Sequence, residues 1–163
     1  MRLQSYIKEA VSKGYTFQLC TPAIKKLGKV RKNTTHERCF INKPDHGFWT
    51  STLKGKNQSE WTEWARAERF GDISSGTVLK IQPGVSMYII DNKSHYEKLL
   101  ERFPYEDIYL DFVEISKVYD ALYVTRNGVS KNHMKLYAWD VESTVWFNTD
   151  KLKIVGTVNP RER

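Results

Sequence analysis

Two acidic residues late in the chain are the first candidates for a chemical role. The stretch 137–148 reads YAWDVESTVWFN, with Asp140 and Glu142 two residues apart. If the stretch forms one strand, the two carboxylates share a face. Burying an unpaired carboxylate costs on the order of several kcal/mol, so acids that open a buried strand often lie at a sheet edge or a cleft. Glu142 is therefore a candidate for binding a sugar hydroxyl or stabilising a cation. A cap or a salt bridge is the structural alternative.

A hydroxyl-rich stretch earlier in the chain is the second signal. Residues 47–52 read GFWTST. On a strand, Trp49 and Ser51 share one face, while Thr50 and Thr52 share the other. Trp49 could stack on a nucleobase or a nicotinamide ring, and Gly47 allows close backbone approach. The pattern therefore predicts that Trp49 and Ser51 line a pocket together, although an ordinary core strand remains the alternative.

Basic residues gather in one part of the sequence. The formal net charge is +7, and seven basic residues with one acid, Glu37, lie between residues 24 and 43. These basic residues are Lys25, Lys26, Lys29, Arg31, Lys32, Arg38 and Lys43. Such a segment attracts phosphates by Coulomb forces and counterion release. We expect an anionic ligand or a nucleic acid as partner, with a solvated basic loop as the alternative.

The sequence carries no motif for several other kinds of functional site. The four histidines are scattered, and none has a metal-ligand spacing to Cys20 or Cys39, so we predict no metal site. No glycine-rich phosphate loop and no GxSxG elbow occurs. A cysteine paired with a histidine as a nucleophile stays open, as does a disulfide between the two cysteines.

The bulk composition favours one globular domain over residues 1–163. Apolar residues make up 40% and charged residues 28% of the 163 residues, a balance typical of folded proteins. No apolar run approaches the roughly 18 residues of a membrane span, and residues 1–14 lack the apolar block of a signal peptide. We therefore expect a cytoplasmic protein with no membrane partner. The oligomeric state is left open.

The expected elements in the first half are two helices and two strands. Residues 3–13 favour a helix that buries Leu3, Tyr6, Ile7, Ala10 and Val11. Residues 15–20 and 47–52 favour strands. A helix over about 58–70 is expected after an Asn57–Glu60 cap, with its aromatic residues towards the buried side. Those residues, with the alanine between them, are Trp61, Trp64, Ala65 and Phe70.

The second half mixes short helices with many strands. Capping patterns at Ser94 and Asp111 predict helices that end near Pro104 and Tyr119. Pro83-Gly84 and Asn127-Gly128 are typical of turns between strands. The expected strands are 77–81, 85–90, 121–125, 134–139, 143–148 and 152–158. This order favours an α+β domain with a split or mixed, mostly antiparallel sheet and a few short helices.

The WTST and ESTVWFN motifs, in this order, resemble the ADP-ribosyltransferase superfamily. The run from Glu142 to Val158 also resembles the family's terminal pattern of glutamate, apolar strand, short loop and last strand. The resemblance implies a small split α+β fold, NAD as co-substrate, and transfer of ADP-ribose to a nucleic acid or protein acceptor. It makes Glu142 the carboxylate that stabilises the oxocarbenium-like transition state.

The resemblance also implies roles for other residues. Ser51, with Thr50 or Thr52, would order Glu142 or the ribose, and Trp49 would pack on the nicotinamide. Arg31, Arg38 and Lys43 would contact the pyrophosphate or the acceptor. The family's first strand usually carries an Arg or a His-Gly-Thr, whereas residues 15–21 offer Gln18 and Thr21, so Arg31, His36 or Arg38 are substitutes for that role. We place Gln18 among the NAD contacts.

One further position departs from the family and leaves the acceptor open. Family members that modify arginine or guanine often carry Gln or Glu two residues before the catalytic acid, where this chain has Asp140. Two competing functions also remain. One is a non-enzymatic basic domain that binds nucleic acid. The other is a metal-dependent nuclease that uses Glu142, Asp140 and a histidine.

Overall fold

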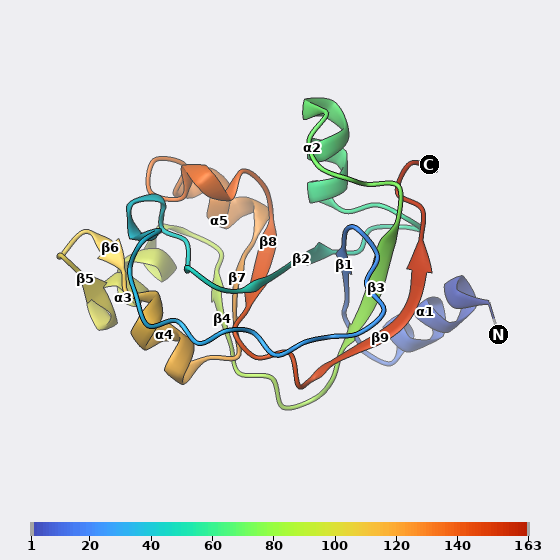
Figure 1. The fold of residues 1–163 in the computed structure, drawn as a ribbon, viewed down its shortest axis with the longest axis horizontal. Coiled ribbons are helices and arrows are strands. Elements are labelled where there is room, and N and C mark those ends of the chain that lie inside the picture. The colour runs from blue at the N-terminus through green and yellow to red at the C-terminus, as the bar shows by residue number, and fades with distance from the viewer. Residues whose placement is uncertain (1, 163) are drawn as a thin grey trace. The chain divides into compact units, whose positions relative to one another are not determined.

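The chain crosses four times between two groups of packed segments. A computed structural model describes residues 2–162 (Figure 1). The first unit contains the chain up to Gly28, Thr50–Val85 and the chain from Asp150 onward. The second unit contains Lys29–Trp49 and Ser86–Thr149. Because each unit is assembled from distant segments, no single cut in the sequence separates them. The single domain over residues 1–163 stays a prediction.

Four strands form the sheet of the first unit. The central strand β1 pairs antiparallel with β2 and β3, and β3 pairs antiparallel with β9. The bounds are β1 Phe17–Cys20, β2 Phe48–Thr52, β3 Gly76–Ile81 and β9 Leu152–Val158, of which β2 starts in the second unit. All four strands were expected near these positions from their apolar and β-branched residues.

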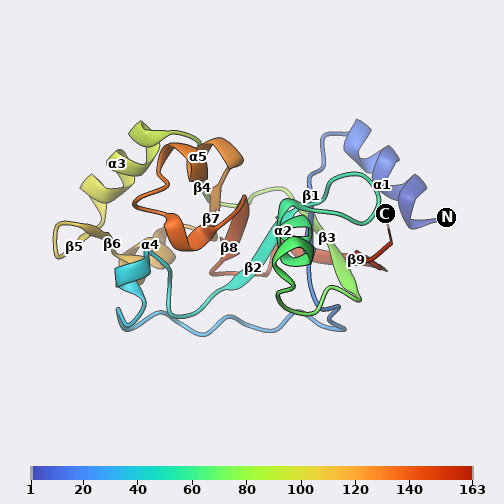
Figure 2. The same ribbon diagram turned by 90° about the horizontal axis from the view of Figure 1, so that it is seen from above.

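Helix α1, Leu3–Ser12, packs on this sheet. Its buried residues Ile7 and Ala10 join Phe17, Leu19 and Val78 in one apolar cluster. Figures 1 and 2 show the helix beside β9 and β3. The expected buried face was too wide, because Val11 is 53% exposed.

Helix α2, Glu60–Glu68, differs from its prediction in its start and in its buried face. Ser59 and Thr62 form a reciprocal capping box, so the expected cap at Asn57 was wrong. Only Thr62 and Ala65 are buried. The three aromatic residues pack against one another, with Trp61 and Trp64 half-buried and Phe70 57% exposed.

In the second unit, three strands pair in a mixed arrangement. β7 pairs in parallel with β4 and antiparallel with β8. The bounds are β4 Met87–Ile90, β7 Ala121–Val124 and β8 Ser143–Trp146, and a two-stranded hairpin joins β5 Pro104–Tyr105 to β6 Tyr109–Leu110. Helices in both units and the mixed strand pairing confirm the α+β class.

Three α-helices and two 3₁₀ turns complete this unit. They are α3 Lys93–Arg102, α4 Phe112–Val118, α5 Arg126–Lys131, η1 Cys39–Ile41 and η2 Tyr137–Trp139. Helix α3 contacts β4 and α5 contacts β7, and the two helices lie side by side in Figure 2. Asp111 caps α4 by accepting a hydrogen bond from Glu114 N, as expected. Asn92 caps α3 in place of the expected Ser94.

Three local predictions in this region were wrong. Pro83-Gly84 does not join a hairpin, because β4 pairs with β7 and not with β3. Residues 134–139 form no strand and end in the turn η2. Asn127-Gly128 lies inside α5, where Thr125 caps the helix by accepting from Gly128 N. Gly128 is required for packing, since a Cβ there would lie 2.1 Å from Ile90 O.

Replacing Gly128 tests this packing. We expect Gly128→Ala to lower the free energy of unfolding by about 2 kcal/mol or more, because the methyl group would clash with backbone. Gly28→Ala is the matched control, since a Cβ added there has no heavy atom within 4 Å and the change should stay within about 0.5 kcal/mol. Urea denaturation measures both, and equal stability of the two variants would contradict the close approach.

Candidate functional site

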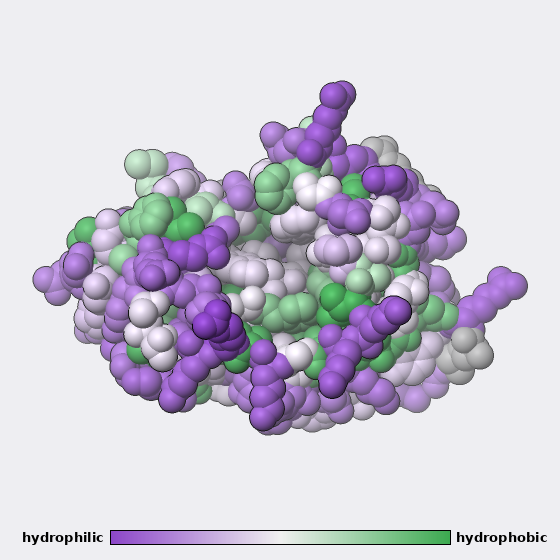
Figure 3. Space-filling model, viewed as in Figure 1, coloured by the Kyte–Doolittle hydropathy of each residue, from purple (hydrophilic) through white to green (hydrophobic). Residues whose placement is uncertain are grey.

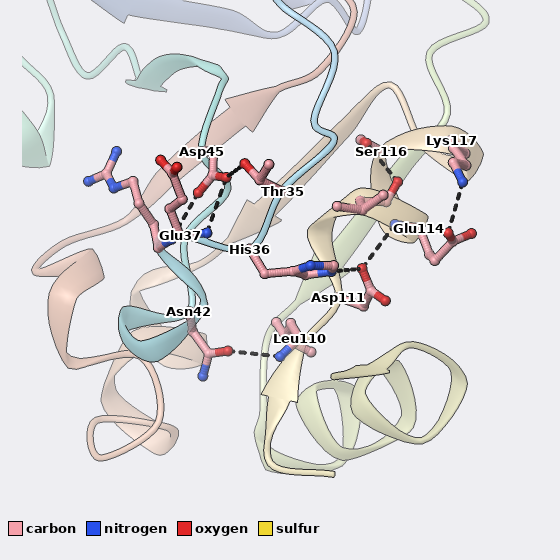
Figure 4. Close-up of polar contacts among 12 residues, drawn as sticks. Thr35, His36, Glu37, Asn42, Asp45, Leu110, Asp111, Glu114, Ser116 and Lys117 are labelled. Carbon is pink, nitrogen blue, oxygen red and sulfur yellow. Dashed lines mark hydrogen bonds and ion pairs between the residues drawn. The ribbon is translucent and has the colours of Figure 1, made fainter. Parts of the chain in front are cut away.

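Polar side chains hold the segment 29–49 in place within the second unit. Asn33 Nδ2 donates to His46 O, and His46 N donates to Asn33 Oδ1, both at 2.9 Å. Asp45 accepts hydrogen bonds from the Thr35 hydroxyl, Glu37 N and Arg38 N (Figure 4). The segment has almost no regular secondary structure, so these contacts set its path.

His36 adds an anchor to the hairpin and to α4. Its Nε2 lies 2.9 Å from Asp111 Oδ1, and its ring stacks on Tyr105 with centroids 3.8 Å apart. The same Asp111 carboxylate caps α4, as Figure 4 shows. His36 is therefore engaged in holding the segment, which leaves it poorly placed as a substitute for the family's first-strand residue.

Asn42 connects the segment to several other elements of the unit. It is 3% exposed and has a left-handed backbone with φ of 52°, a conformation that asparagine tolerates better than most residues. Its Nδ2 donates to Tyr96 Oη at 3.1 Å and to Lys135 O at 2.9 Å. Its Oδ1 accepts from Leu110 N, and its carbonyl accepts from the indole N–H of Trp139. Asn42 thus joins α3, β6 and η2.

Lys43, which follows Asn42, forms a cationic and aromatic cluster with Trp49 and Trp139. Lys43 Nζ lies 5.2 Å from the centroid of the Trp49 ring, and the Trp49 and Trp139 rings meet at 4.9 Å and 69°. Gly47 lies directly against β8, since a Cβ there would meet Val145 Cγ2 at 2.3 Å. Lys43 and Trp49, predicted as ligand contacts, therefore lie together in one unit with β8.

Burial lowers the pKa of Lys43 from its usual value. The positive charge of Arg38 lowers this pKa further, whereas the carboxylate of Asp140 opposes the shift. Lys43 is thus a half-buried cation that lies within the electrostatic reach of Asp140. Its charge is available to an anion in an environment where water screens it less than at the surface.

The two acids differ in exposure, and the strand face expected for them was wrong. Asp140 is exposed and lies in the turn after η2 with φ of 58°. Glu142 is 5% exposed and immediately precedes β8. Neither acid is within a strand, because the chain reaches β8 only at Ser143. A buried carboxylate and an exposed one two residues apart can serve different roles.

The remaining predicted NAD contacts gather on β1 and β2 of the first unit. Thr50 Oγ1 donates to Gln18 Oε1 at 2.9 Å, and Gln18 Nε2 donates to Thr52 Oγ1 at 3.3 Å. Gln18 and Thr50 are buried. The three side chains share a face, as the register of Gln18 opposite Thr52 requires. The expected alternation along β2 is therefore present.

Ser51 lies on the opposite face of β2. It pairs with Leu19, a member of the apolar cluster under α1. Its Oγ is buried and has no hydrogen-bond partner within residues 2–162. The hydrogen bonds between the side chains of β2 and Gln18 therefore come from the two threonines and not from Ser51.

The cysteines show no sign of nucleophilic chemistry. Both are free thiols. Burial raises the pKa of Cys20 to about 11, and burial with the nearby Glu106 raises the pKa of Cys39, so the reactive thiolate is disfavoured at both positions. In the described part of the chain, no cysteine bonds to a histidine, and no group of three or more metal-ligating side chains could hold an ion.

Comparisons with known proteins add no evidence on the function of the chain. The chain has no significant match among protein-family models, curated proteins or solved structures. Within residues 2–162 no helix has the length and apolar character needed to cross a membrane. Any inference about function therefore rests on the residues of the chain itself. Sequence reasoning missed Asn42 and Asp45, because their roles depend on partners that are distant in sequence or belong to the backbone.

Replacing Lys43 tests whether its positive charge lowers the stability of the folded protein. Because the folded pKa is lowered, folding disfavours the charged form, and we expect Lys43→Met to be at least as stable as the wild type at pH 7. The wild type should gain stability relative to the variant as pH rises through the lowered pKa towards 10.5, the usual value. Denaturation of both proteins between pH 7 and pH 10.5 measures this difference. A variant less stable by about 1 kcal/mol or more at pH 7 would show that Lys43 stabilises the fold.

Proposed function

We propose that the chain is an NAD-dependent ADP-ribosyltransferase with Glu142 as its catalytic carboxylate. One observation carries the proposal. A buried glutamate opens β8 in the same unit that brings together Lys43, Trp49 and Trp139. Buried ionisable groups gather at functional sites, which favours a binding or catalytic role for Glu142 and Lys43. The resemblance in the WTST and ESTVWFN motifs supplies the reaction class.

The chemistry needs a carboxylate at the reacting sugar. When the nicotinamide–ribose bond breaks, nicotinamide leaves with the bonding electrons and the ribose develops oxocarbenium character. A carboxylate near the ribose 2′-hydroxyl stabilises that charge, more strongly where water is excluded. The nucleophile of the acceptor then bonds to the same ribose carbon and loses its proton. Glu142 is assigned the stabilising role because it is the buried acid.

Within the second unit, a cation and an aromatic ring fit two parts of NAD. Lys43 supplies a cation for the pyrophosphate, and Trp49 supplies an aromatic face for the nicotinamide. The NAD role that the resemblance gives to Gln18, Thr50 and Thr52 stays a prediction, because Gln18 is 2% exposed and its amide bonds to both threonines.

The exposed Asp140 is the candidate for contact with the acceptor. It lies two residues before Glu142, at the position where family members that modify arginine or guanine often carry Gln or Glu. Its positive φ and its exposure set it apart from the buried acid. We propose a macromolecular acceptor, either nucleic acid or protein, whose reacting group approaches Asp140.

Replacing Glu142 tests the proposal. We expect Glu142→Gln to slow nicotinamide release from NAD by about a hundredfold or more, because an amide cannot supply the negative charge. Glu97→Gln is the matched control, since Glu97 is an exposed glutamate of the same unit and its loss should leave the rate unchanged. Nicotinamide is quantified by chromatography with candidate acceptors present. Equal rates in wild type and Glu142→Gln would remove Glu142 from the mechanism.

The exposed basic segment favours one alternative, a non-enzymatic domain that binds nucleic acid. The two functions differ in their response to NAD. A transferase should be stabilised thermally by NAD or a non-reactive analogue, because a ligand that binds only the folded state raises its stability. A binding domain should show salt-dependent affinity for nucleic acid and no response to NAD. We propose no metal-dependent nuclease activity.

A further inference from the structure

Four exposed cations lie along one short segment of the second unit. They are Lys29, Arg31, Lys32 and Arg38, and within residues 2–162 none of them has an ion pair. Figure 3 shows hydrophilic side chains projecting from the surface where this segment runs in the view of Figure 1. The positive charge is therefore presented to solvent and is not neutralised by the fold.

The backbone that carries these cations is held in place. Asn33 is buried and bonded to His46 on both sides of its amide, directly after Lys32. His36 is fixed by Asp111 and Tyr105, and the Asp45 carboxylate bonds to Arg38 N. Asp45 is thus occupied by the segment's own backbone and hydroxyl donors. An anchored array loses less conformational freedom on binding than a mobile tail.

An exposed aromatic ring lies at the end of the array. Phe40 is 62% exposed and belongs to the turn η1, two residues after Arg38. An isolated exposed ring needs no explanation. A ring at the end of a row of free cations is the combination that binds single strands, where the cations contact phosphates and the ring stacks on a base.

We propose that the segment 29–40 is a binding site for a single-stranded nucleic acid. Lys29, Arg31, Lys32 and Arg38 contact the phosphate backbone, and Phe40 stacks on an unpaired base. Single strands are favoured over duplexes because a paired base offers no free face to Phe40. They are favoured over acidic proteins because every nucleotide carries a flat base beside its phosphate, whereas the acidic side chains of a peptide carry no ring. The inference rests on the proposed transferase in one respect alone, namely that the bound strand is its acceptor.

Charge removal tests the phosphate contacts. Fluorescence anisotropy with a fluorescein-labelled oligothymidylate gives the affinity at several salt concentrations. We expect the Lys29→Gln, Arg31→Gln and Lys32→Gln triple variant to reduce the slope of log K against log salt by about 2, since each single-strand phosphate contact contributes roughly 0.7. The control removes the same charge from exposed Lys98, Lys131 and Lys135, none of which has an ion pair in the described chain. Equal slopes for the two triple variants would overturn the site.

Ring removal tests the stacking separately. We expect Phe40→Ala to weaken binding roughly tenfold while leaving the salt slope unchanged, because stacking involves no counterion release. Phe70→Ala is the control, since Phe70 is 57% exposed but lies in the first unit, away from the basic segment in sequence. Tighter binding of the matching duplex, or equal competition by polyglutamate, would overturn the single-strand assignment.

Binding and catalysis can fail independently. Glu142→Gln should bind the labelled strand as tightly as the wild type, because Glu142 is buried and outside the segment. Strand binding without NAD turnover in the wild type would support the site and reject the transferase. NAD turnover without strand binding would reject the site and leave the transferase in place.

Discussion

The hydrogen bonds of Asn42 are the constraint on which the second unit depends. One buried residue contacts α3 through Tyr96, β6 through Leu110, and both ends of the 135–139 stretch through Lys135 and Trp139. Leaving such buried groups unpaired costs on the order of 1–3 kcal/mol each. The backbone on both sides of Asn42 is therefore fixed, with the anchored cations before it and Lys43 after it. Trp139 is held at the same node, and its ring meets that of Trp49.

The residues near Asn42 are not those that would make the folded protein most stable. Burial lowers the pKa of Lys43, Asp140 has a positive φ that favours glycine, and Glu142 carries a carboxylate into the interior. The lowered pKa of Lys43 and the positive φ of Asp140 each cost free energy that an apolar residue or a glycine would avoid. These features, together with the buried Glu142 before β8, are the reason for proposing a functional site in this unit.

Local patterns predicted the elements that a short stretch of sequence encodes by itself. The Asp111 cap, the strands β8 and β9, and the alternation that places Thr50 and Thr52 on one face are such cases. Residues 134–139 look like a strand by composition, but Trp139 turns inward to bond to Asn42, 97 positions earlier in sequence. Gly128 matches a turn pattern in the sequence, but in the structure it packs closely against Ile90. Of the candidate site, the sequence indicated Glu142, Trp49 and Lys43, but it could not reveal the hydrogen bonds of Asn42 beside Lys43 and Trp139.

The central claim is that Glu142 faces the reacting ribose of NAD. A crystal structure of the protein with a non-hydrolysable NAD analogue tests this most directly. The account predicts the nicotinamide-bearing ribose within hydrogen-bond distance of the Glu142 carboxylate, with the pyrophosphate near Lys43 and the nicotinamide near Trp49. An analogue bound away from Glu142, or no analogue bound at saturating concentration, would contradict it.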